Sequence, residues 1–216
     1  MRFLYMSKKN EPYKEAAISI AKQLCRDAIW HNGACNWLST YRDPDDAMFF
    51  YTRSCNEYFY DSVGGITFFL MQVSSISDDV IIKDTARGAL LQLMNNEEAS
   101  GIGFYTGLTG LAFVLLEAGD VLNEKKYHDA GKQRLKQVIG INPADCKLDV
   151  AEGIAGAIPF LIRLQKKYKD KWLKEFIFSL ADILLQKKSE HVFGWSWHTM
   201  EDAIHDLSGF GHGASG

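Results

Sequence analysis

The sequence lacks the features that would tie it to a membrane or to nucleic acid. No apolar stretch approaches the roughly 20 residues that a helix needs to cross a bilayer, and the first residues carry too short an apolar run for a secretion signal. The net charge of −3 and the pI near 6.1 give no electrostatic reason to bind nucleic acid. We therefore expect a soluble cytoplasmic protein without a nucleic-acid partner.

Cysteine is also scarce. The chain has four cysteines and no C-x-x-C pair, so the spacing of a zinc ribbon is excluded; they are Cys25, Cys35, Cys55 and Cys146. A chain with 47% hydrophobic residues builds a core that needs no disulfide to hold it. We expect these thiols to be structural or incidental, and we assign none of them to a metal.

The alternation of apolar and polar residues that is typical of β-strands is absent over any useful length. Apolar residues recur instead at helical spacing, which predicts an all-α protein. The predicted helices are residues 17–28, 66–73, 82–93, 108–115, 124–138, 154–168 and 173–184. Pro159 falls inside one of them, so we expect that helix either to begin later than Ile154 or to bend there.

Two segments give weaker patterns. The aromatic-rich segment from Trp37 to Tyr60 is ambiguous, and a helix with a loop fits it better than a strand in a helical chain. The segment from Lys188 to Leu207 is irregular and rich in tryptophan. We expect it to be a loop with a short helix.

A short glycine signature recurs along the chain, at or near the start of an apolar run. Its second glycines fall at positions 65, 110, 156 and 216, at intervals of 45, 46 and 60 residues; the four copies are Tyr60–Ile66, Tyr105–Leu111, Asp149–Gly156 and Phe210–Gly216. Repetition of this length indicates helical units that bury a core against one another. Glycine at a helix start permits close backbone approach and positive φ.

The pattern predicts helical hairpins, each with an apolar inner helix that follows the glycines and a more amphipathic outer helix. The fourth signature lies on the last residue, so the sequence looks cut within its own repeat. Half of a ring would leave apolar faces bare, and we expect self-association or poor solubility.

These signatures resemble the lanthionine synthetase C-like family, whose cyclases form thioether rings in lanthipeptides. Asp149–Gly156 resembles its D-V-x-x-G-x-x-G segment, and Leu207–Gly216 resembles its L-x-G-x-x-H-G-x-x-G segment. Tyr105–Gly110 and Tyr60–Gly65 match the two earlier repeats, with Ser62 where a glycine is usual. The resemblance covers the chain from about residue 60 to its end.

The resemblance implies an α/α toroid of seven helical hairpins, of which about four are represented in a single partial domain, residues 1–216. Family members hold a catalytic zinc with two cysteines and a histidine, in C-x-G-like and C-H-G segments of later repeats. Neither segment is present in this sequence. We therefore expect no cofactor and no metal site in this chain, zinc being expected only in a complete family member.

His212 is the first candidate for a catalytic residue. The resemblance implies an acid/base group beside the zinc site, and a histidine titrates near neutral pH, so it can pass protons there. Flanked by Gly211 and Gly213, its ring would be free to face a cavity. The alternative is a histidine that only caps a helix start or forms a hydrogen bond there.

Asp149 is the second candidate. Aspartate is among the best N-cap residues, so it is open to a purely structural interpretation. The resemblance implies instead that it lies at the cavity and interacts with His212 or with the substrate, and both roles can hold together. We expect Asp61, in the first repeat, to be only a cap.

Other polar and aromatic residues are weaker candidates. His191, His198, His205 and His212 recur every seven residues, but glycines interrupt any single helix through them, so we interpret the spacing as chance. Trp195 and Trp197 are better explained as buried anchors of an irregular segment than as the rim of a peptide-binding site.

Three functions remain open. The first is the N-terminal part of a lanthipeptide cyclase, inactive alone, whose partner in the complete protein is a dehydrated precursor peptide. The second is a non-catalytic module that binds peptides or thiols. The third is a carbohydrate-active toroid enzyme, which needs paired carboxylates; Asp149 and Glu152, three residues apart, do not make a convincing pair.

Overall fold

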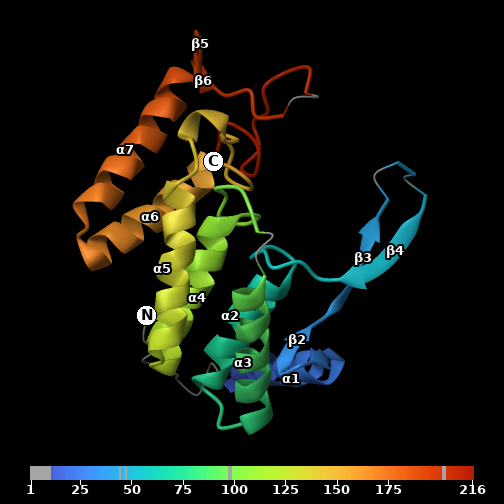
Figure 1. The fold of residues 1–216 in the computed structure, drawn as a ribbon. Helices are drawn as coiled ribbons and strands as arrows, with labels where there is room; N and C mark the ends of the chain where they lie inside the picture. The colour runs from blue at the N-terminus through green and yellow to red at the C-terminus, as the bar shows by residue number, and fades with distance from the viewer. Residues whose placement is uncertain (1–10, 44, 47, 97–98, 201–202) are drawn as a thin grey trace. The chain divides into compact units, whose positions relative to one another are not determined.

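The computed structural model describes residues 11–43, 45–46, 48–96, 99–200 and 203–216, and in that part of the chain it has seven α-helices and six short strands (Figure 1). The helices are α1 (Glu11–Asp27), α2 (Val63–Ser74), α3 (Val80–Asn95), α4 (Leu108–Leu122), α5 (Lys125–Ile139), α6 (Ile154–Tyr168) and α7 (Lys171–Gln186). The strands are β1 (Ile29–His31), β2 (Ala34–Asn36), β3 (Leu38–Arg42), β4 (Phe50–Ser54), β5 (Ser189–His191) and β6 (Gly194–Ser196), and a short 3-10 helix, η2, covers Pro143–Asp145.

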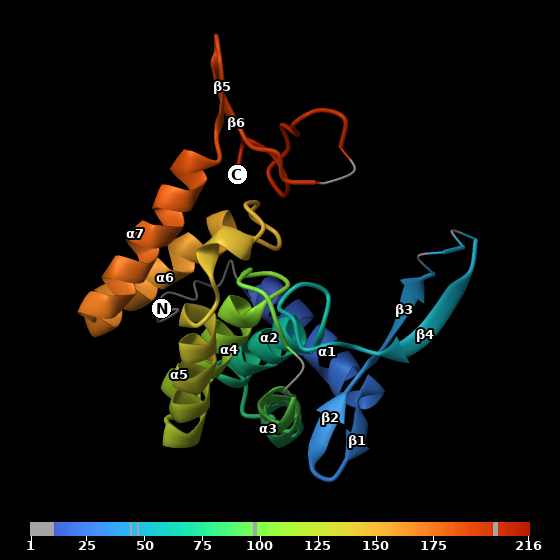
Figure 2. The same cartoon turned by 45° about the horizontal axis from the view of Figure 1, so that its top comes forward.

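The chain forms two compact units. The first comprises Met1–Glu57 and Ser62–Asn96, and the second comprises Tyr58–Asp61 and Glu97–Gly216. In the first unit α2 packs on α3, and α1 contacts both. In the second unit α4 packs on α5 and α6 packs on α7, while α4 also contacts α6 (Figures 1 and 2).

The predicted all-α architecture of helical hairpins is confirmed. The helices that follow the glycine signatures, α2, α4 and α6, are each followed by a partner helix that packs against them. Helix α4 is buried along most of its length, whereas α5 alternates between buried and exposed faces. None of the helices in the described residues combines the length and the apolar character that crossing a membrane demands. Closure of the hairpins into a toroid stays a prediction.

The prediction of a helix between Trp37 and Tyr60 is wrong. Strands β3 and β4 form an antiparallel hairpin in which Tyr41 lies opposite Tyr51, after a shorter hairpin of β1 and β2. The turn of the first hairpin is Asn32-Gly33, with φ of 49° and 79°. Such a pair is the residue choice of a tight hairpin turn, and aromatic and β-branched residues favour the strands that follow.

The prediction of a short helix between Lys188 and Leu207 is also wrong for the described residues, which form the antiparallel hairpin of β5 and β6 and then a loop. Figure 2 shows this hairpin following the end of α7. Helix α6 begins at Ile154, so the expected later start is wrong, and Pro159 is accommodated inside the helix. A bend at Pro159 stays a prediction.

All four glycine signatures close with the same backbone hydrogen bond, from an N–H to the carbonyl seven residues earlier. The pairs, with N···O distances, are Val63 to Asn56 (3.1 Å), Leu108 to Gly101 (2.9 Å), Ile154 to Lys147 (2.9 Å) and Ala214 to Leu207 (3.0 Å). This recurrence aligns the four repeats residue by residue. It places Ser62 at the position of Gly107, Gly153 and Gly213.

The second glycine of a signature permits a close backbone approach, as predicted. A Cβ added to Gly156 would lie 1.9 Å from the carbonyl oxygen of Val150, and one on Gly110 would lie 1.9 Å from that of Phe104. Neither glycine has a positive φ. The signature therefore needs glycine because there is no room for a side chain, and the expected positive φ is not the reason.

Candidate functional site

The third and fourth glycine signatures lie against each other in the second unit. The carbonyl of Gly211 accepts hydrogen bonds from the N–H groups of both Val150 and Ala151, each at 3.1 Å. A Cβ on Gly216 would lie 2.3 Å from Cγ2 of Val150, so the close fit continues to the end of the described chain. These contacts hold the backbone around His212 next to the backbone around Asp149.

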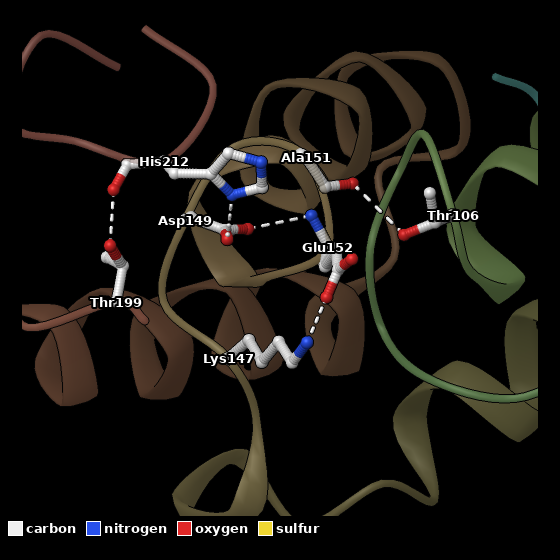
Figure 3. Close-up of polar contacts among 7 residues, drawn as sticks. All are labelled: Thr106, Lys147, Asp149, Ala151, Glu152, Thr199 and His212. Carbon is white, nitrogen blue, oxygen red and sulfur yellow. Dashed lines mark hydrogen bonds and ion pairs between the residues drawn. The ribbon is translucent and has the colours of Figure 1, made fainter. Parts of the chain in front are cut away.

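The two predicted site residues are in direct contact. Nδ1 of His212 lies 2.7 Å from Oδ2 of Asp149, and Figure 3 shows the imidazole ring above the carboxylate. Because an ionised carboxylate can only accept a hydrogen bond, Nδ1 carries the proton of this bond. This leaves Nε2 free for chemistry, the arrangement by which a carboxylate orients a catalytic imidazole.

The two partners differ in exposure. The side chain of Asp149 is 1% exposed, whereas that of His212 is 41% exposed. A buried carboxylate needs hydrogen-bond donors to offset its desolvation, and the imidazole supplies one. The exposed part of the ring remains accessible to a molecule that approaches from solvent.

A second hydrogen bond fixes the carboxylate of Asp149. Its Oδ1 accepts the backbone N–H of Glu152 at 2.7 Å (Figure 3). Asp149 is not the N-cap of α6, because that position belongs to Gly153, so the N-cap interpretation is wrong in its strict form. Its side chain instead stabilises the turn that precedes the helix.

The other acidic residues near the signatures are not part of this pair. Glu152 forms an ion pair with Lys147, so Asp149 and Glu152 do not face each other as two free carboxyl groups (Figure 3). Asp61 is not the N-cap of α2, because Ser62 holds that position. The shared register aligns Asp61 with His212 and not with Asp149, and Asp61 has a φ of 46°.

His212 is fixed on its backbone as well as on its ring. Its carbonyl accepts a hydrogen bond from the hydroxyl of Thr199, a residue that the sequence did not single out (Figure 3). Its ring forms a hydrogen bond with Asp149. The alternative, a histidine that only caps a helix start or forms a hydrogen bond there, therefore stays a prediction beside the catalytic role.

Two of the four histidines that recur every seven residues belong to one hydrogen-bonded cluster. His191 Nε2 lies 2.7 Å from Oγ of Ser196, and His198 Nδ1 lies 3.3 Å from Oδ1 of Asp206. Ser196 donates to the other oxygen of Asp206. Ser196 and Asp206 were missed because a hydroxyl at the end of β6 and a carboxylate ten residues later in a loop form no recognisable motif.

The tryptophans of this segment differ from each other. Trp197 donates its indole N–H to the carbonyl of Leu184 at 2.8 Å and is half-buried, which is the expected anchoring role. Trp195 is 51% exposed, so the expectation that it is buried is wrong. The ammonium of Lys188 lies 4.0 Å from the centre of the Trp195 ring.

The described residues do not fit a zinc ion. No three histidine, cysteine, aspartate or glutamate side chains in the described part of the chain lie close enough together to hold a metal. Burial raises the pKa of the Cys35 thiol to about 12, and burial also raises the pKa values of Cys25 and Cys146. Zinc binds the thiolate form of cysteine, so these three thiols are poor ligands as they stand.

Comparison with known proteins agrees with the repeats. A family model described as "Lanthionine synthetase C-like protein" matches residues 56–216. The match includes all four glycine signatures and confirms the resemblance inferred from them. No curated protein matches the chain.

Proposed function

Because the chain belongs to the lanthionine synthetase C-like family, we propose that it is part of a thioether cyclase that acts on a dehydrated peptide. The reaction is the addition of a cysteine thiol to dehydroalanine or dehydrobutyrine. The observation that carries the proposal is the bond between Nδ1 of His212 and the buried carboxylate of Asp149. It leaves Nε2 available to move a proton near neutral pH.

The proposed role of His212 is to protonate the addition intermediate. The sulfur forms a bond to Cβ of the dehydro residue, and the electrons of the carbon–carbon double bond move onto Cα and its carbonyl as an enolate. His212, in its imidazolium form, then donates the proton on Nε2 to Cα and becomes a neutral imidazole. Nε2 takes up the proton that the thiol releases, which restores the imidazolium. Asp149 stabilises the imidazolium form by accepting its Nδ1–H throughout.

In the family, zinc supplies the thiolate by lowering the pKa of the substrate thiol. The described residues of this chain offer no ligand set for that ion. We therefore propose that the chain does not form rings alone, and that it constitutes a partial toroid domain of a cytoplasmic protein. None of its four cysteines forms a disulfide in the described part of the chain, which is compatible with that reducing compartment.

A second candidate is a non-catalytic module that binds a peptide. The lack of a metal ligand set among the described residues favours it, because binding needs no activation of the thiol. The carbohydrate-active alternative is weakened by the ion pair between Glu152 and Lys147, which removes the second carboxylate that such a mechanism requires.

The test supplies the missing nucleophile from outside. A synthetic peptide with one dehydroalanine is incubated with the 216-residue chain and excess 2-mercaptoethanol at pH 8.5, where part of the thiol is already thiolate. Protonation at Cα creates a stereocentre, so proton delivery by His212 would give one configuration in excess. The ratio of the two configurations is measured by chiral amino-acid analysis after hydrolysis, with peptide binding followed by fluorescence anisotropy.

We expect a stereochemical excess with the parent chain and its loss in His212→Gln. His205→Gln is the matched control, because His205 is exposed and outside the described site. Peptide binding without any excess would overturn the proton-transfer role and support the binding module. Neither binding nor excess would overturn both candidates.

A further inference from the structure

A chain of hydrogen bonds starts at the hairpin of β5 and β6 and lies outside the pair of Asp149 and His212. His191 at the end of β5 contacts Ser196 at the end of β6, at 2.7 Å. The hydroxyl of Ser196 donates to Oδ2 of Asp206, and His198 contacts Oδ1 of the same carboxylate at 3.3 Å. The carboxylate of Asp206, near the end of the loop, thus contacts both Ser196 and His198 at its start.

This cluster contains a serine, two histidines and an aspartate, but its bonding pattern is not that of an activated nucleophile. A hydroxyl has one proton, and Ser196 donates it to Asp206. His191 must then donate to Ser196, so it cannot act as the base that would remove the serine proton. The cluster is arranged to hold the loop, and it does not make Ser196 reactive.

The hydrogen bond from Ser196 lowers the pKa of Asp206, and His198 contributes in the same direction. Asp206 is therefore a carboxylate at neutral pH and can accept both bonds at once. Charge-assisted hydrogen bonds of this kind are stronger than bonds between neutral groups. They fix the backbone at Ser196 and His198 on one side of the loop and at Asp206 on the other.

The next residue after His198 connects this loop to the candidate site. Thr199 donates its hydroxyl proton to the carbonyl of His212 (Figure 3). On the other side, the carbonyl of Gly211 is held by Val150 and Ala151. The peptide groups on both sides of the His212 Cα are thus anchored, one to the loop of Asp149 and the other to the loop that Asp206 closes.

We propose that Thr199 and Asp206 are positioning residues for His212: Asp206 holds the loop, and Thr199 transmits its position to the backbone that aims the imidazole at Asp149. The catalytic meaning of this positioning rests on the proposed function. The effect of Thr199 and Asp206 on geometry does not depend on that function, because it concerns only which nitrogen of the His212 ring carries the proton. An experiment can therefore contradict the positioning role without contradicting the proposed function, and the reverse.

The test reads the tautomer of His212 directly. The 216-residue chain is labelled with ¹⁵N-histidine, and long-range proton–nitrogen correlation spectra distinguish the Nδ1–H form from the Nε2–H form at a pH where the ring is neutral. His212→Gln assigns the signal among the six histidines, and Asp149→Asn calibrates the effect of weakening the contact. The test variants are Thr199→Val, which removes the hydroxyl, Thr199→Ser, which keeps it, and Asp206→Ala.

We expect Thr199→Val and Asp206→Ala to lower the ratio of the Nδ1–H to the Nε2–H form about fivefold, the effect of losing roughly one hydrogen bond. Thr199→Ser should retain the parent ratio. The matched control is Ser215→Ala, which removes another hydroxyl-to-carbonyl bond of the same segment, from Ser215 to Ser208 at 2.5 Å. It should leave the His212 signal unchanged.

The inference is overturned if Thr199→Val and Asp206→Ala both keep the parent tautomer ratio, or if Ser215→Ala changes it as much as they do. The signal of His128, which pairs with Asp120 at 3.1 Å in another part of the unit, reports whether each variant remains folded. If a variant loses that signal too, the question is decided by Thr199→Ser. The inference predicts the parent His212 ratio there, and any fall in that ratio with His128 intact contradicts it. Suppose that Thr199→Val and Asp206→Ala change the tautomer ratio but the parent chain gives no stereochemical excess in the thiol-addition experiment. That result would contradict the proposed function and still support the positioning role.

Discussion

Trp37 and Trp197 make the same hydrogen bond in two different parts of the chain. The indole N–H of each donates at 2.8 Å to the carbonyl of a residue 13 positions earlier, Leu24 for Trp37 and Leu184 for Trp197. Each tryptophan comes directly after a short hairpin that follows a helix, α1 in one case and α7 in the other. The helix, the hairpin and the tryptophan thus form a second repeated feature, in addition to the glycine signature.

Trp37→Phe is expected to lower the free energy of unfolding by about 1–3 kcal/mol, because it removes both the hydrogen bond and part of a buried ring. Trp37 is 4% exposed, whereas Trp197 is half-buried, so Trp197→Phe should cost less. Equilibrium urea unfolding followed by circular dichroism measures both variants. An equal loss of unfolding free energy in the two variants would contradict the idea that burial of Trp37 adds to its contribution.

Gly156→Ala is expected to destabilise the protein by about 2 kcal/mol or more, because the new Cβ would lie 1.9 Å from the carbonyl oxygen of Val150 and the backbone must move. Gly209→Ala is the matched control, since among the described residues beyond its chain neighbours nothing lies within 4 Å of the added Cβ. Thermal unfolding of the two variants under identical conditions makes the comparison. A similar melting temperature for both would show that the signature does not depend on close approach.

Ser62→Ala is expected to be neutral or to stabilise the protein by up to about 1 kcal/mol. Ser62 is buried at the N-cap position of α2, yet its hydroxyl makes no capping bond and has no hydrogen-bond partner among the described residues. The usual loss on replacing an N-cap serine should therefore not occur. A cost above about 1 kcal/mol in urea unfolding would show that the hydroxyl does have a stabilising partner.

Asp149→Ala and Asp149→Asn separate the two hydrogen bonds of this carboxylate. Alanine leaves the N–H of Glu152 without its acceptor, so we expect a loss of about 1–3 kcal/mol in unfolding free energy. Asparagine can still accept that N–H and should cost less than alanine. Both should abolish the stereochemical excess in thiol addition, so a stable Asp149→Asn variant with full selectivity would remove Asp149 from the mechanism.

Cys35 is expected to react with iodoacetamide at pH 8 at least about 100-fold more slowly in the native protein than in urea. Its pKa near 12, against an ordinary value near 8.5, leaves very little of the reactive thiolate. Because the native state holds this proton more tightly than the unfolded chain, stability should fall as the pH rises from about 8.5 towards 12. Mass spectrometry of tryptic peptides gives the rate at each cysteine, and fast native labelling of Cys35 would contradict its burial.

The helices could be predicted from the sequence because their apolar residues recur at helical spacing over several turns. The hairpin of β1 and β2 and the hairpin of β5 and β6 could not, because these strands are only three residues long and offer no measurable alternation. Asn32-Gly33 was a usable signal for the turn of the first hairpin. At Pro159 the sequence signal was misleading in the other direction. The local preference of proline would shorten helix α6, yet the helix continues through this residue because its buried residues pack in the unit.

The candidate site was predictable only in part. Asp149 and His212 stand inside the glycine signatures, so the repeats pointed to them and the structure places them in contact. Thr199 and Asp206 lie in a loop without periodicity, and their bonds to His212 and to Ser196 depend on how that loop returns. Such contacts follow from the path of the backbone, which residue spacing in a loop does not determine.

The backbone hydrogen bond that closes each glycine signature, from an N–H to the carbonyl seven residues earlier, has a consequence for protein engineering. In each of the four turns that it closes, one residue directly precedes the small residue of the turn: Asp61, Thr106, Glu152 and His212. The hydrogen bond that the four turns share joins main-chain atoms and does not involve this side chain, so the side chain can be exchanged without removing that bond. Thr106→His would place an imidazole at the corresponding position of the second turn. Each turn thus offers a position at which a new functional side chain can be introduced.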